Sequence, residues 1–161
     1  MVGSNNALEP WHGIDEGHHA DQPRGDRLSV FGQRQAANLA WLEAALARAA
    51  IGRALAVVVL THANPRFDLQ PGHPKRAGFE AVIEALRRLT LRFGRPVLLA
   101  HGDQYVFIVD RPMADASPPV RNLLRVQTFG EPLAGWVRIE VDPDRPGVFH
   151  AQPRRSARAR N

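Results

Sequence analysis

The sequence contains no cysteine, which excludes disulfide bonds, thiolate metal sites and a cysteine nucleophile. Long apolar runs are missing too, because no stretch approaches the roughly 20 consecutive apolar residues that span a bilayer. No Gly-x-Ser-x-Gly elbow, phosphate-binding P-loop or dinucleotide fingerprint occurs. These absences disfavour a membrane-spanning protein, a serine hydrolase of the elbow type, a P-loop nucleotide hydrolase and a Rossmann enzyme.

The composition that remains is that of one globular domain. Apolar residues make up 44% and charged residues 23% of 161 residues, so one core of ordinary size is expected. With 13 glycines and 13 prolines, the sequence predicts many turns and loops.

The net charge of +5 is concentrated toward the end of the chain, where Arg154, Arg155, Arg158 and Arg160 stand without an acidic neighbour. We interpret residues 153–161 as a disordered basic tail. A solvated tail is favoured over a nucleic-acid-binding arm because no aromatic residues are interleaved for base stacking. Nucleic acid and membrane are therefore not the expected partners.

The chain is organised around residues 54–65, an apolar run that ends in His62, Asn64 and a proline. Such a run is typical of a strand buried on both faces, as in a parallel sheet covered by helices. Ligands collect at the carboxyl ends of strands in open α/β sheets. His62 is thus a candidate site residue, and a histidine hydrogen-bonded in a strand-end turn is an equally good interpretation.

A second strand repeats this arrangement. Residues 33–50 and 79–93 show apolar residues at steps of three and four, which predicts two amphipathic helices, the second ended by Gly94 and a proline. Residues 97–100 then form an apolar strand followed by His101, Gly102 and Asp103. If the two strands are parallel neighbours, their ends lie within roughly 5 to 10 Å of each other.

The remaining segments have less regular patterns. Residues 1–30 lack a sustained period and are predicted to be a long loop. The histidines and carboxylates of this loop match no fixed pattern of metal ligands, and a solvated loop is the favoured interpretation. After about residue 106 the sequence predicts short antiparallel or mixed strands at 106–109, 124–128, 136–141 and 148–152.

The two strand ends offer imidazole nitrogen and carboxylate oxygen, from His62, His101 and Asp103, with the amide of Asn64 beside them. These donors suit a divalent metal ion such as Mn, Fe or Zn, and a pair of such ions activates water and holds a phosphate. Two catalytic metals need about six to eight protein ligands, and these ends provide about three. The residues therefore predict an incompletely bound metal.

An ordered set of segments resembles the carboxyl-terminal half of a calcineurin-like metallophosphoesterase, over roughly residues 3–150. The segments are Gly-Ser-Asn-Asn at 3–6, Asn-Leu-Ala-Trp-Leu at 38–42, the strand of 58–65 ending in Thr-His-Ala-Asn-Pro, the segment 96–103 ending in His-Gly-Asp, Val-Gln-Thr-Phe-Gly at 126–130 and Trp-Val-Arg-Ile at 136–139.

The resemblance implies an α/β fold that is part of the family's layered α/β/β/α sandwich, with two metals at the strand ends. It implies that residues 1–152 form a partial domain. His62 matches the family's late histidine ligand. Asp103 and Tyr105 stand where the family has a Gly-His-x-His segment, and His101 lies one residue before it as a ligand or as a donor that orients one.

The sequence also departs from the family. The early Asp-x-His, Gly-Asp-x-x-Asp and Gly-Asn-His-Asp/Glu segments have no counterpart before His62. Two hypotheses follow: a domain that hydrolyses a phosphate ester when its site is completed, or a truncated or degenerate domain that is catalytically inactive and acts as a binding module. In both, missing neighbouring strands predict exposed sheet edges and self-association.

Overall fold

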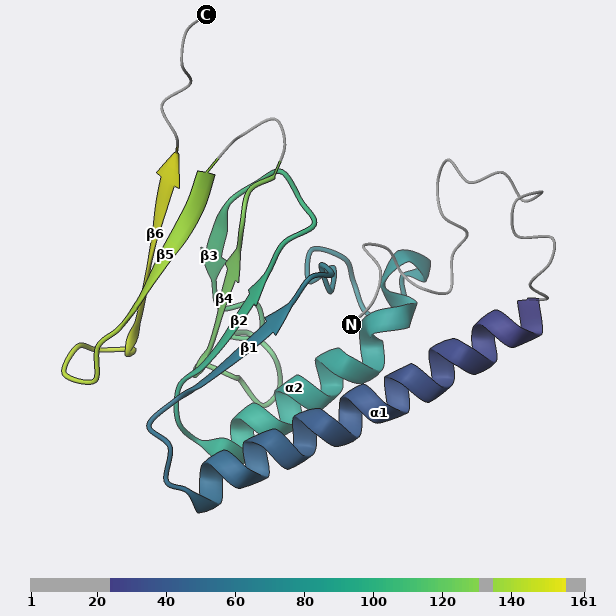
Figure 1. Cartoon of the computed structure of the whole chain (residues 1–161), viewed down its shortest axis with the longest axis horizontal. Helices are drawn as coiled ribbons and strands as arrows, with labels where there is room; N and C mark the ends of the chain where they lie inside the picture. Colours follow the sequence, from purple (N-terminus) through teal and green to yellow (C-terminus); the bar gives the residue numbers. More distant parts are fainter. Residues whose placement is uncertain (1–23, 131–134, 156–161) are drawn as a thin grey trace, which may run out of the picture.

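The computed structural model describes residues 24–130 and 135–155. Helix α1 (Arg24–Ile51) leads into strand β1 (Val57–Thr61), a 3₁₀ helix η2 (Pro74–Phe79) and helix α2 (Glu80–Phe93) (Figure 1). Strands β2 (Val97–His101), β3 (Ile108–Asp110), β4 (Leu123–Gln127), β5 (Gly135–Val141) and β6 (Phe149–Arg155) follow. No helix in these ranges is long and apolar enough to cross a membrane.

Four strands form a mixed sheet in the order β1-β2-β4-β3. Strands β1, β2 and β4 are parallel, whereas β3 runs antiparallel to β4. The predicted parallel arrangement of the strands after residues 54 and 97 is thus confirmed, as is the change to mixed pairing later in the chain. The register aligns Thr61 with His101 and His101 with Gln127, so three strands end at the same level.

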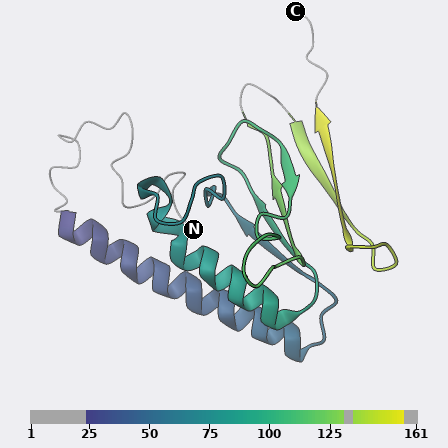
Figure 2. The ribbon, with the colours of Figure 1, turned by 180° about the vertical axis from the view of Figure 1, so that it is seen from behind.

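Both helices pack on one face of this sheet (Figures 1 and 2). The apolar face of α2 supplies Leu86, Leu89 and Phe93, which join Val97 and other inward-facing strand residues in the main core. The helix ends as the sequence predicts. Gly94 adopts a left-handed conformation with φ 68°, which glycine adopts at little cost, and its N–H donates to Thr90 O.

Helix α1 begins earlier than predicted. It starts at Arg24, so the expectation of a loop through residue 30 is wrong for residues 24–30. Leu42 and Leu46 are buried against α2, whereas Leu28, Val30 and Gly32 in the first turns are exposed. Helix formation is cooperative, so the well-packed second half of α1 supports the continuation of the helix toward Arg24. The segment at 3–6 lies outside the described residues, as do the histidines and carboxylates of the expected solvated loop: His12, Asp15, Glu16, His18, His19 and Asp21.

Strands β5 and β6 form a separate antiparallel ribbon on the other face of the sheet, seen beside it in both views (Figures 1 and 2). Phe149 packs here against Leu98 and Val126 of the main sheet. Gly135 permits a close approach, because a Cβ atom at that position would collide with the Phe129 ring. The described residues therefore form three layers of helices, sheet and ribbon, and the four-layer sandwich is not shown.

The last strand is longer than predicted. It continues to Arg155, so residues 153–155 of the expected tail are paired with β5. Residues 156–161 lie outside the described ranges.

Strand β1 forms an open edge of the main sheet. The Val57 N–H donates to Pro96 O of the segment before β2, at 3.0 Å. The backbone N–H and C=O groups of successive residues point to alternate sides of a strand, so those of Val58 and Leu60 point away from β2. Their side chains are 44% and 75% exposed. The exposed edge that the sequence predicts is present, while self-association stays a prediction.

Candidate functional site

The candidate site lies at the carboxyl ends of β1 and β2. Because these strands are parallel neighbours in register, their ends meet, as the sequence predicts. The connection is direct, since the Gly102 N–H donates to His62 O at 3.2 Å. On the other side of β2, the Thr128 N–H donates to His101 O at 2.9 Å. Three strand ends are thereby fixed around two histidines.

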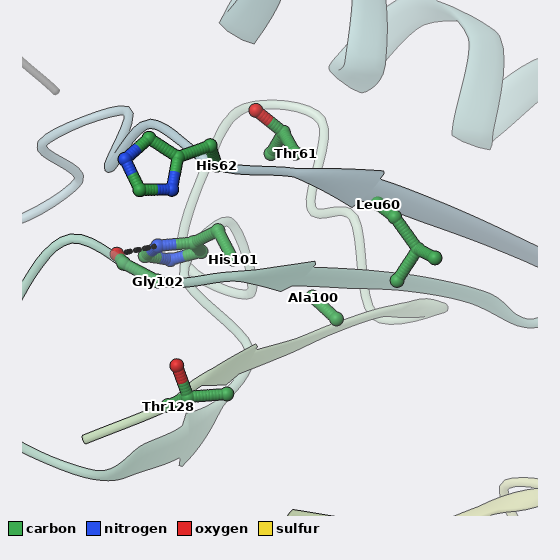
Figure 3. Close-up of a pocket in the computed structure, with 7 residues that line it drawn as sticks. All are labelled: Leu60, Thr61, His62, Ala100, His101, Gly102 and Thr128. Atoms are coloured by element: carbon green, nitrogen blue, oxygen red, sulfur yellow. Dashed lines mark hydrogen bonds between the residues drawn. The ribbon is translucent and has the colours of Figure 1, made fainter. Parts of the chain in front are cut away.

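An open pocket of about 370 Å³ occupies this position. Figure 3 shows the rings of His62 and His101 side by side at the strand ends, with the Thr61 and Thr128 hydroxyls on the strands around them. Leu60, Ala100 and Gly102 complete the lining. The pocket thus combines apolar side chains with imidazole and hydroxyl groups at the ends of three strands.

His101 is only 2% exposed, and its environment fixes its chemical form. Nδ1 lies 3.1 Å from Gly102 O, and only an N–H can donate to a carbonyl, so Nδ1 carries the proton (Figure 3). Burial is the largest influence on His101 and lowers its pKa, and the positive charge of Arg125 lowers it further. The hydrogen bond to Gly102 O and the carboxylate of Asp110 raise the pKa and offset part of this change. The side chain is therefore a neutral imidazole at neutral pH.

The other nitrogen of this ring is the unusual group. His101 Nε2 is buried, and within the described ranges no hydrogen-bond partner lies near it. A buried polar atom without a partner is unfavourable. A neutral imidazole whose Nδ1–H is held by a backbone carbonyl, with Nε2 free, has the form in which histidine binds metals.

His62 and Asp103 face each other across the strand ends. Asp103 has a positive φ of 65°, an uncommon conformation outside glycine that Asp and Asn tolerate best. Burial raises the pKa of Asp103, whereas the nearby His62 and a hydrogen bond from the Asn64 N–H oppose that change. The turn after β2 thus directs the Asp103 carboxylate back toward the end of β1.

Asn64 and Tyr105, both candidates for substrate or supporting roles, have different surroundings. Asn64 is 3% exposed, and its Oδ1 accepts the Arg66 N–H at 2.9 Å. This Asx turn shapes the segment that follows β1, so the Asn64 side chain is structural, and the Asn64 backbone N–H holds Asp103. Tyr105 is 69% exposed and does not line the pocket.

The donors fit a metal ion in kind but not in number. His62, His101 and Asp103 offer imidazole and carboxylate groups at one edge of the sheet, which suits Mn, Fe or Zn. Across residues 24–130 and 135–155, however, no three His, Asp or Glu side chains come together closely enough to hold a metal. The described residues therefore supply part of a metal centre and not a complete one.

Sequence reasoning missed a buried polar row on β4 beside His101. Arg125 forms a bidentate ion pair with Asp110, with Nε 2.7 Å from Oδ1, and lies 5.4 Å from the Phe67 ring centroid. Gln127 Nε2 donates to Val106 O at 2.7 Å. The signal was the two-residue alternation of polar side chains at 125 and 127. These bonds hold the segment that follows Asp103.

A scan of the sequence against protein-family models, and comparisons with curated proteins and with solved structures, found no match.

Proposed function

We propose that the chain carries part of the metal-binding and substrate-binding edge of a calcineurin-like phosphoesterase domain. His62, His101 and Asp103 are the residues assigned to the metal. The observation that carries the proposal is His101: a neutral imidazole that lines the same pocket as His62 and whose buried Nε2 has no hydrogen-bond partner among the described residues. A purely structural histidine of this burial normally has both nitrogens bonded.

A metal ion in a phosphoesterase lowers the pKa of bound water and polarises the phosphate. The described residues contribute to such a site without completing it. Gly102 O fixes the His101 tautomer, and the Asn64 N–H holds the Asp103 carboxylate near His62. The pocket is open, so an extended phosphate ester has access to it. Hydrolysis requires further ligands beyond these three side chains.

A second candidate function is binding without catalysis. It is favoured by the lack of three clustered metal-ligand side chains in the described part of the chain and by the exposed position of Tyr105. In this alternative the domain keeps the fold and part of the pocket and binds a ligand without turnover. The two candidates share the site and differ in whether bound metal leads to hydrolysis.

The test is metal analysis of the purified chain, titration with Mn²⁺ and Zn²⁺ by calorimetry, and a chromogenic phosphodiester assay. His62→Ala removes an exposed candidate ligand. His73→Asn is the matched control, because His73 is an exposed histidine that caps η2 through its side chain and Asn retains capping ability.

For an enzyme we expect about one or more bound metals and turnover that His62→Ala abolishes and His73→Asn retains. Metal bound through His62 without turnover supports the binding module. If neither metal binds, or if both variants bind it equally, the assignment of His62 to a metal is refuted.

A further inference from the structure

The outward face of the β5–β6 ribbon has no covering layer among the described residues. Its register pairs Trp136 with Arg154 and Arg138 with Gln152. Paired residues in antiparallel strands point to the same side, so these four side chains share one face, which we term the ribbon face. The opposite side carries Val137, Ile139 and Ala151, which pack toward the main sheet.

The ribbon face exposes a large aromatic ring among cationic groups. Trp136 is 58% exposed, and the Arg138 side chain is 53% exposed. Arg154 Nη2 donates to Gln152 Oε1 at 2.8 Å, and within the described ranges no carboxylate pairs with Arg154. A hydrogen bond to a neutral amide leaves its charge uncompensated. An indole ring beside an uncompensated guanidinium group is a combination that recognises stacked, negatively charged ligands.

Charge is distributed unevenly along the ribbon. Residues 135–161 contain six arginines and three carboxylates, the latter being Glu140, Asp142 and Asp144. Glu140 is already paired with Arg138 at 2.8 Å and with Arg145 at 3.8 Å. All three carboxylates lie toward the β5–β6 turn. The end with Trp136, Arg154 and Arg155 is therefore cationic.

We propose that the ribbon face binds single-stranded nucleic acid, with a base stacked on Trp136 and a neighbouring phosphate bound by Arg154. An arginine tail without aromatic residues argues against such a partner. The fold changes that argument by placing Trp136 directly opposite Arg154. A single strand is favoured over a duplex because a lone ring on a ribbon stacks on an unpaired base, and duplex bases are already stacked.

This surface is independent of the candidate phosphoesterase site. None of its four residues lines the pocket at the ends of β1 and β2. A failed metal or hydrolysis experiment therefore leaves the proposal intact, and the converse also holds.

The experiment uses the full chain and a fluorescein-labelled 15-nucleotide oligothymidine, with binding followed by anisotropy at several salt concentrations. Trp136→Ala tests stacking and Trp41→Ala is its control, since Trp41 is 69% exposed on α1. Arg154→Gln tests the phosphate contact. Arg92→Gln on α2 is its control, because it removes the same charge from an exposed position elsewhere.

We expect Trp136→Ala to weaken binding about 5- to 100-fold and Trp136→Phe to restore most of it, with Trp41→Ala unchanged. Arg154→Gln lowers the slope of log affinity against log salt by about 0.7, the value for one phosphate contact on a single strand. Circular dichroism verifies that each variant is folded.

Four results overturn the proposal, the first three of which concern binding, stacking and strandedness. These are no binding at low salt, equal loss in the Trp136 and Trp41 variants, or a duplex of the same length that competes as well as the single strand. Equal effects of Arg154→Gln and Arg92→Gln show binding by net charge alone and also exclude a specific ribbon face.

Discussion

Asp110→Asn removes the partner of a buried cation while preserving the size of the side chain. The Arg125 side chain is 7% exposed and that of Asp110 is 39% exposed, so the two halves of this ion pair differ in their access to water. Without the carboxylate, Arg125 remains buried without its ion-pair partner, and Asp68 acts on it only as a weaker Coulombic neighbour. Without Arg125, by contrast, Asp110 can be hydrated where it stands. We therefore expect the two single substitutions to be unequal.

Removing one partner of a fully buried pair costs about 3–5 kcal/mol. Asp110 is partly exposed, and Asn keeps one acceptor oxygen, so we expect Asp110→Asn to lower the free energy of unfolding by about 2–3 kcal/mol. Arg125→Met fills the space with an apolar chain and loses the contact with Phe67, which corresponds to about 1 kcal/mol. The double substitution should resemble Arg125→Met, since no charge then remains.

Urea denaturation measures these differences. With a slope of about 2 kcal/mol per molar urea, Asp110→Asn shifts the midpoint down by about 1–1.5 M. Asp115→Asn, at an exposed loop position, is the matched control and should shift it little. If Asp110→Asn lowers the urea midpoint no more than Arg125→Met or Asp115→Asn does, then Asp110 does not stabilise the buried charge of Arg125.

Two further predictions concern the candidate site and the sheet edge. Burial lowers the pKa of His101 below the ordinary 6.5, so the folded protein takes up a proton less readily than the unfolded chain. Stability therefore falls as the pH drops below about 6.5 and becomes constant below the folded-state pKa of His101. The His101→Gln variant should lack this fall in stability between pH 7 and 5. Thermal unfolding measures both proteins, and identical pH profiles would contradict the prediction. Leu60→Lys places a charge on the open edge of β1 and should weaken association through that edge. Light scattering at rising protein concentration should then show a smaller mean mass for the variant than for the unmodified chain. Equal masses would exclude this edge as the route of association.

The secondary structure follows from local patterns where packing and pattern agree. Helix α2 was predicted at 79–93 and spans Glu80–Phe93, because its apolar face is the face that packs and Gly94 ends it. The start of α1 was not predictable in the same way, since residues 28–30 are exposed and the sequence there contains Gly25 and Gly32. The pairing of β4 with β2 depends on contacts distant in sequence, which periodicity does not encode.

In the candidate site, too, some features follow from the sequence pattern and others depend on tertiary contacts. That His62 and His101 lie together followed from two strands that each end in histidine, because parallel neighbours share an edge. The tautomer of His101, the left-handed turn at Asp103 and the Asx turn of Asn64 depend on backbone geometry that the residue types do not specify. The ion pair of Arg125 joins two strands whose adjacency was unknown. The sequence thus located the candidate site, and tertiary contacts determined the chemical state of its groups.

The ribbon of β5 and β6 has a consequence for local opening. Its ladder pairs only these two strands, and in the described residues its link to the main sheet is an apolar contact around Phe149 rather than a backbone ladder. Such a unit can separate from the sheet without breaking the sheet's own hydrogen bonds. Amide hydrogens of β5 and β6 should therefore exchange with solvent before those of β2 and β4. A ligand that keeps the ribbon packed on the main sheet would slow amide hydrogen exchange in β5 and β6 and leave exchange in β2 and β4 unchanged.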